Sequence, residues 1–232
     1  MQLENCGVPT MTERFRDRRE AGLLLAAKLT AYAHRKDVLV LGLPRGGIPV
    51  AFEVAKALHV PLDVLVVRKL GVPGEEELAM GAIATGDVLV FNDLVVRSMC
   101  ISKEDIDQAV AFERRILQQR ERLYRGDRVP YRVKDRAVIL VDDGIATGAT
   151  MHAAIAALKQ QHCAHIVVAT PTIAAQACQE FASAADEFVC VIKPELFFAV
   201  GCWYEHFVPT SDDEVRNLLD QAAKAYSARE EF

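Results

Sequence analysis

The chain has 232 residues, of which 51% are hydrophobic and 25% charged, as in a globular protein with a substantial core. Its net charge of −5 argues against a nucleic-acid-binding protein. The N-terminus has no apolar signal segment, and no stretch approaches 18 apolar residues. The six cysteines are scattered without metal-ligand spacing. We therefore expect a cytoplasmic protein, in a reducing compartment, that binds neither membrane nor nucleic acid.

Segments with strand and helix patterns alternate along the chain, which predicts an α/β fold: a largely parallel sheet flanked by helices. A capping box opened by Ser102 marks the start of the long central helix. The expected helices cover 12–35, 48–58, 101–124, 173–185 and 211–228, with a further helical run at 152–158. The expected strands cover 38–41, 61–67, 87–91, 137–141, 164–170 and 187–192.

The segment Ala137 to Met151 carries the most specific pattern. Five apolar residues predict a buried strand, and Asp142 and Asp143 stand where that strand should end. Small and hydroxyl-bearing residues then lead into a helix, an arrangement whose free N–H groups and dipole favour an anion. Two carboxylates beside a phosphate site make sense if the ligand also presents hydroxyls or a divalent metal. A sugar phosphate meets both requirements.

This segment resembles the phosphoribosyl-pyrophosphate-binding motif of type I phosphoribosyltransferases. The resemblance implies a transferase acting on 5-phosphoribosyl 1-pyrophosphate with Mg²⁺, which binds largely through the substrate, with Asp142 or Asp143 as candidate ligands. It implies that both acids act catalytically by addressing the ribose hydroxyls. It also implies a 5-phosphate site formed by Ala146, Thr147, Gly148, Ala149 and Thr150.

Three further turns should meet this segment, because the carboxyl ends of parallel strands share one crevice. The turn Leu43-Pro-Arg-Gly-Gly47 resembles the family's pyrophosphate loop, with Arg45, Gly46 and Gly47 as contacts and a frequently cis peptide before the basic residue. The long stretch 68–85 resembles the flexible catalytic loop, in which Arg68 and Lys69 would neutralise the leaving pyrophosphate. An ordinary surface loop is the alternative for this stretch.

The aromatic turn 197–207 has two interpretations: a small core beneath the C-terminal helix, or the family's hood over the nucleobase. In the second, Val200, Trp203 and Tyr204 would bind the acceptor. We expect one phosphoribosyltransferase domain over residues 1–232 that forms a homodimer. Its core would span about 37–192, with a helical insertion at about 93–135, a hood at about 193–210 and helices at both ends.

The acceptor is not readable from these residues. Ala146 stands where members acting on 6-oxopurines usually carry an acid, which disfavours a hypoxanthine–guanine enzyme. The main hypothesis is an active enzyme that transfers phosphoribose to a nitrogen nucleophile of a nucleobase. A non-catalytic phosphoribosyl-pyrophosphate sensor is the alternative, disfavoured by the presence of Arg45, Arg68 and Lys69. A dinucleotide oxidoreductase is disfavoured because no strand is followed by G-x-G-x-x-G.

Overall fold

A computed structural model describes residues 14–230 of the chain. Its body is a five-stranded parallel sheet in the order β2-β1-β6-β7-β8, with β6 at the centre. The strands are β1 (Val38–Gly42), β2 (Leu62–Val64), β6 (Ala137–Val141), β7 (His165–Thr172) and β8 (Glu187–Ile192). The predicted α/β fold class, a largely parallel sheet flanked by helices, is confirmed.

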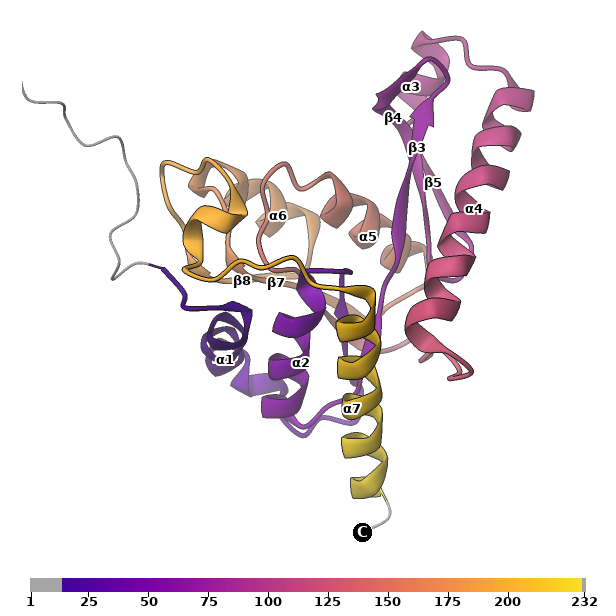
Figure 1. Cartoon of the computed structure of the whole chain (residues 1–232). Helices are drawn as coiled ribbons and strands as arrows, with labels where there is room; N and C mark the ends of the chain where they lie inside the picture. The colour runs from indigo at the N-terminus through magenta and orange to yellow at the C-terminus, as the bar shows by residue number, and fades with distance from the viewer. Residues whose placement is uncertain (1–13, 231–232) are drawn as a thin grey trace, which may run out of the picture.

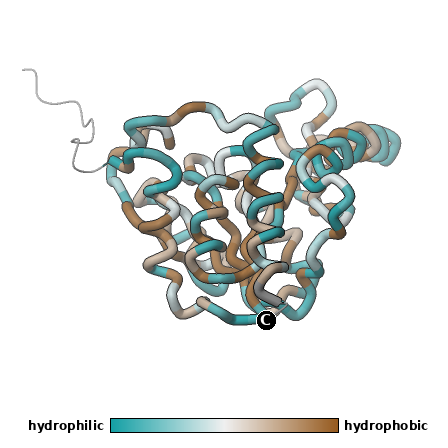
Figure 2. The backbone as a smooth tube through the Cα atoms, turned by 60° about the horizontal axis from the view of Figure 1, so that its bottom comes forward, coloured by the Kyte–Doolittle hydropathy of each residue, from teal (hydrophilic) through white to brown (hydrophobic). Residues whose placement is uncertain are grey.

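Helices cover both faces of this sheet (Figure 1). One face carries α1 (Arg18–Lys28), α2 (Gly47–Leu58) and α7 (Asp212–Glu230), and the other carries α5 (Ala149–Gln160) and α6 (Cys178–Ala184). Alternate residues of the strands point to opposite faces, as the two-residue period of a strand requires. In β6, Ile139 therefore packs under the first set of helices and Leu140 under the second. Figure 2 shows the hydrophobic segments concentrated in the interior of the body.

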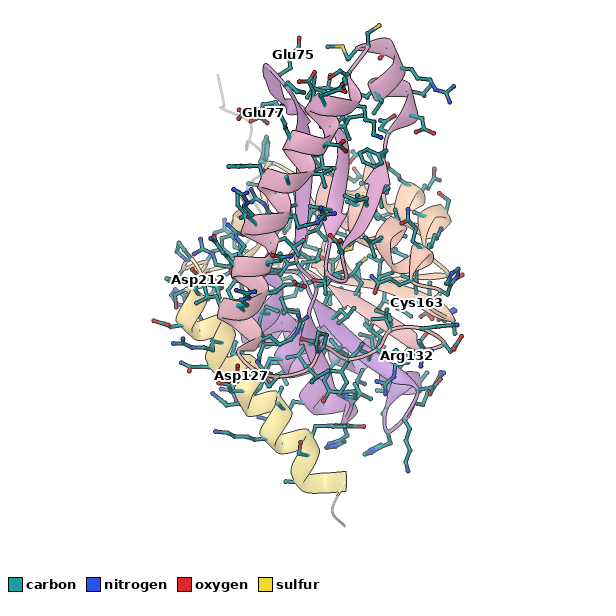
Figure 3. All side chains as sticks on the ribbon, turned by 90° about the vertical axis from the view of Figure 1, so that its right-hand side faces the viewer. Glu75, Glu77, Asp127, Arg132, Cys163 and Asp212 are labelled. Carbon is teal, nitrogen blue, oxygen red and sulfur yellow. The ribbon has the colours of Figure 1, made fainter. Side chains whose placement is uncertain are left out.

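A second sheet is antiparallel and was not predicted. It contains β3 (Val67–Val72), β4 (Glu75–Ala84) and β5 (Val88–Phe91). Together with α3 (Asp93–Ser98) and α4 (Lys103–Arg125) it forms an arm, residues 67–125, that projects from the body (Figure 1). Glu75 and Glu77 lie toward the far end of this arm (Figure 3) and are exposed to solvent.

Several predicted boundaries are wrong. The stretch 68–85 is not an irregular loop, because β3 and β4 form a β-hairpin there. The strand expected over 61–67 is divided between β2 and β3. The first helix does not fill 14–35: Asp17 caps it by accepting from the Glu20 N–H, and a short 3₁₀ turn follows it. Residues 12 and 13 of that prediction lie outside the described part. The helix expected over 173–185 is reduced to a 3₁₀ turn and α6.

The other predicted helices and strands of this part of the chain are confirmed. Ser102 caps α4, where its side chain accepts the Asp105 N–H at 3.1 Å. The helices α2, α5 and α7 and the strands β1, β5, β6, β7 and β8 lie at the expected places. No helix within residues 14–230 is both long and apolar enough to cross a membrane.

Candidate active site

The central motif lies at the carboxyl end of β6, the middle strand of the body. Asp142 and Asp143 follow the strand directly, and α5 begins beyond them at Ala149. Gly148 occupies the N-cap position with φ of +71°, and no side chain caps the helix. The first N–H groups of α5 are therefore open to a ligand, and the helix dipole favours an anion there. Ala146, Thr147, Ala149 and Thr150 surround this opening and are exposed or half-buried.

Gly148 is needed for two reasons. Its positive φ suits glycine, and a Cβ at this position would lie 2.3 Å from the ring of Phe181. Phe181 is fully buried, and its ring stacks on His152 of α5 with a centroid distance of 4.4 Å. Phe181 thus supports the loop before α5 from below, a contact that no sequence pattern indicated.

The turn after β1 packs directly on the two acids. The Leu43 N–H donates to the Val141 carbonyl at 2.9 Å. A Cβ on Gly46 would lie 2.0 Å from Asp143 Oδ2, and one on Gly47 would lie 2.7 Å from the Val141 carbonyl oxygen. The two glycines are therefore required by the packing of this turn against β6 and the Asp143 carboxylate. The expected cis peptide joins Pro44 to Arg45.

Asp143 is held by two groups from distant segments. Arg18 Nε donates to Asp143 Oδ2 at 2.8 Å, and the Tyr204 hydroxyl donates to the Asp143 carbonyl at 2.5 Å. Burial raises the pKa of Asp143, and Arg18 opposes that rise. The pKa of Asp142 lies well above its usual range, because that carboxyl is buried and faces the charge of Asp143. Sequence reasoning missed Arg18.

The arm brings further charge to this edge. Lys69 is exposed, and Arg68 pairs with Glu113 of α4 at 2.7 Å. Arg68, Lys69 and Thr150 share the lining of a cavity of about 720 Å³ between the hairpin, α4 and the start of α5. The structure therefore brings the arm beside the expected phosphate loop.

Asp212 links three segments on the other side of the turn after β1. It lies at the start of α7 (Figure 3) and accepts a hydrogen bond from the Tyr124 hydroxyl of α4 at 2.7 Å. The guanidinium of Arg45 lies 3.9 Å from the same carboxylate, and both side chains are about half exposed. Asp212 and Glu113 were not predicted as neighbours of the site. Nothing in their local sequence pattern distinguishes them from solvated acids.

The aromatic turn closes the remaining side. Val200 begins a 3₁₀ turn (Val200–Trp203) and lies so close to Gly144 that a Cβ there would come within 2.4 Å of it. Trp203 and Tyr204 are buried in a small aromatic core with Phe15. The turn therefore forms a small core, but against Phe15 and Ala21 rather than beneath the C-terminal helix. Val200 and Tyr204 also lie against the motif.

The residues present suit a metal that arrives with a substrate. Within the described part of the chain, no group of three or more His, Cys, Asp or Glu could hold a metal ion. Asp143 is already paired with Arg18, so Asp142 and Asp143 offer few free oxygens. A divalent cation would take most of its oxygen ligands from the ligand's phosphates.

Comparison with known proteins agrees with this geometry. Residues 20–206 match the phosphoribosyl transferase domain family. Two Mycobacterium tuberculosis proteins, "Putative phosphoribosyl transferase Rv0571c" and "Putative phosphoribosyl transferase MT0597", are each 49% identical over 92% of this chain. The chain spans 48% of the length of these relatives.

The fold also matches a solved structure. The crystal structure of TT1426 from Thermus thermophilus has a TM-score of 0.80 and 40% identity, covering 90% of this chain and 98% of that one. The turn after β1 and the aromatic turn pack around an Asp-Asp pair beside an open helix N-terminus, and residues 20–206 match the family, so this chain belongs to the type I phosphoribosyltransferase family.

Proposed function

We propose that the protein transfers the phosphoribosyl group of 5-phosphoribosyl 1-pyrophosphate to a nitrogen nucleophile of a nucleobase and releases pyrophosphate. The observation that carries this proposal is the Asp142–Asp143 pair beside the uncapped N-terminus of α5. The helix end suits a phosphate, and the acids suit the hydroxyls of the sugar attached to it. A phosphate alone would be repelled by these carboxylates.

Each segment has a role in this reaction. The loop Ala146 to Thr150 binds the 5-phosphate through backbone N–H groups and hydroxyls. The carboxylates of Asp142 and Asp143 accept hydrogen bonds from the ribose hydroxyls. Arg45, Gly46 and Gly47 bind the pyrophosphate. Arg68 and Lys69 of the arm approach the leaving group, which requires Arg68 to leave Glu113. Val200, Trp203 and Tyr204 lie on the acceptor side.

The chemistry breaks the C1–oxygen bond of the donor, and its electron pair leaves with pyrophosphate. The lone pair of the acceptor nitrogen forms the new C1–nitrogen bond, and the nitrogen proton passes to solvent. Mg²⁺ would be held mainly by the phosphates of the donor, with Asp142 or Asp143 as candidate ligands, and would neutralise the charge of the pyrophosphate. The protein contributes orientation and fixed charges placed around an oxocarbenium-like carbon.

We also propose that it works in the cytoplasm as a homodimer.

Donor binding tests this proposal most directly. Phosphoribosyl pyrophosphate with Mg²⁺ should raise the melting temperature of the protein, because a ligand that binds only the folded state stabilises it. Asp142→Asn combined with Asp143→Asn should abolish the shift while the protein stays folded. No shift in the native protein at millimolar donor would reject the assignment.

Pyrophosphate release in the presence of individual nucleobases would then identify the acceptor. A donor that binds without turnover on any base would favour a sensor that binds and does not transfer. Turnover on one base would name the substrate, and hypoxanthine and guanine are expected to be poor because Ala146 provides no acid.

A further inference from the structure

Arg18 is the first residue of α1. It connects the donor motif, residues 142–150, to the segment that follows the aromatic turn. Its Nε donates to Asp143 Oδ2 at 2.8 Å, and its Nη1 donates to the Val208 carbonyl at 2.7 Å. Its guanidinium carbon lies 3.9 Å from the centre of the Phe207 ring. The side chains of Arg18 and Asp143 are only 12% and 13% exposed. One cation thus spans residues far apart in the sequence.

The position is a poor one for a cation on helix grounds alone. A positive charge in the first turn opposes the helix dipole, and burying it costs further solvation. Arg19, the next residue, avoids the second cost: its side chain is 69% exposed and lies 3.3 Å from Glu53. The contacts of Arg18 with Asp143, Val208 and Phe207 therefore explain its placement, and Arg19 is a natural control.

The segment before α1 is attached to the aromatic turn by backbone bonds. The Phe15 N–H donates to the Trp203 carbonyl at 2.9 Å, and the Glu205 N–H donates to the Phe15 carbonyl at 2.8 Å. Tyr204 in turn donates to the Asp143 carbonyl. A movement of the aromatic turn would therefore displace Asp143, through its contacts with Arg18 and with Tyr204.

We propose that Arg18 is a positioning residue that fixes the Asp143 carboxylate toward the donor ribose and couples it to the aromatic turn on the acceptor side. The inference rests on the proposed transferase function. Arg18 touches neither substrate in this scheme; it acts through Asp143.

The test measures the dissociation constant of phosphoribosyl pyrophosphate with Mg²⁺ at neutral pH, beside the melting temperature of each variant without the donor. For Arg18→Met we expect at least about tenfold weaker donor binding. Arg19→Met should match the native protein in donor affinity. Arg18→Lys should restore part of the affinity but not all of it, because an ammonium lacks the fork that reaches Asp143 and Val208 together.

The outcomes separate the two proposals. A native protein that does not bind the donor at any pH overturns the transferase assignment. Native binding combined with an Arg18→Met donor affinity equal to that of Arg19→Met overturns the role of Arg18 alone. If Arg18→Met does not fold, Arg18→Lys decides, and a lysine variant with native affinity overturns the proposal.

Discussion

The two halves of the donor motif are built in different ways. The half from Ala146 to Thr150 is largely exposed, offers backbone groups to its ligand and depends mostly on local geometry. The half with Asp142 and Asp143 is enclosed by the turn after β1, by α1 and by the aromatic turn. Backbone donors tolerate side-chain replacement, whereas carboxylates in a tertiary enclosure depend on every neighbour. Variants of the two halves should therefore differ in their effects.

The largest effect is expected where the enclosure is tightest. Gly46→Ala would place a Cβ 2.0 Å from Asp143 Oδ2, so the turn or the carboxylate must move. We expect a loss of about 1–3 kcal/mol in the free energy of unfolding and at least about tenfold weaker donor binding. Urea unfolding and donor titration measure the two losses.

Gly126→Ala is the matched control. Gly126 has φ of +59°, and no atom lies within 4 Å of its virtual Cβ. A Cβ there should cost about 1–3 kcal/mol through backbone conformation and leave donor affinity unchanged. Equal donor affinity in both variants would contradict the tight enclosure of Asp143.

Asp142→Asn should weaken donor binding and yet stabilise the free protein at neutral pH. The pKa of Asp142 is raised on folding, so the folded state holds its proton to higher pH than the unfolded state. The native protein therefore loses stability as pH rises from about 4 through the raised pKa. Asparagine removes this loss, and we expect a gain on the order of 1 kcal/mol at pH 7–8.

Urea unfolding at about pH 5 and about pH 8 checks the sign, and Asp213→Asn is the control. The Asp213 side chain is 78% exposed, so its replacement should change stability by no more than about 0.5 kcal/mol. If Asp142→Asn is less stable than the native protein at the higher pH, the carboxylate is not an unfavourable buried charge.

Tyr204→Phe tests the far wall of the enclosure. It removes the hydroxyl that donates to the Asp143 carbonyl, while the ring keeps its contacts with Phe15 and Phe207. We expect a loss of about 1 kcal/mol in stability, since the carbonyl loses a buried partner. Thermal unfolding measures it. Unchanged stability would show that water replaces the hydroxyl.

The smallest effect belongs to the exposed half. Thr147→Ala removes one exposed hydroxyl and leaves the backbone donors in place. We expect about fivefold weaker donor binding, equivalent to about 1 kcal/mol, and stability within about 0.5 kcal/mol of native. Donor titration measures the first quantity. A loss as large as that of Gly46→Ala would contradict the contrast between the two halves.

The sequence could predict the parts of the site that lie within one contiguous segment. The loop 146–150 and the Asp-Asp pair are contiguous and carry their pattern locally, as do the strand β6 and the cap at Ser102. Arg18 and Phe181 reach the motif only through tertiary packing, from segments with ordinary helix patterns. The residue roles assigned from the motif stay predictions until donor binding is measured.

The hairpin β3–β4 was mistaken for a loop because its glycines and charges are also typical of irregular segments. Its strands are stabilised by pairing with each other and by packing against α4 and α5, which no local pattern encodes. The strand break between β2 and β3 was hidden for a similar reason: residues 64–67 are continuously apolar.

The paired cations have a consequence for how a ligand arrives. Arg45 and Arg68 each face a carboxylate of the protein itself, on Asp212 and Glu113. The resting site thus avoids the mutual repulsion that two unpaired guanidinium groups would create. A polyanion that enters the site would displace these carboxylates from Arg45 and Arg68. The released acids belong to α7 and α4, so ligand binding would change the contacts of the C-terminal helix and of the arm.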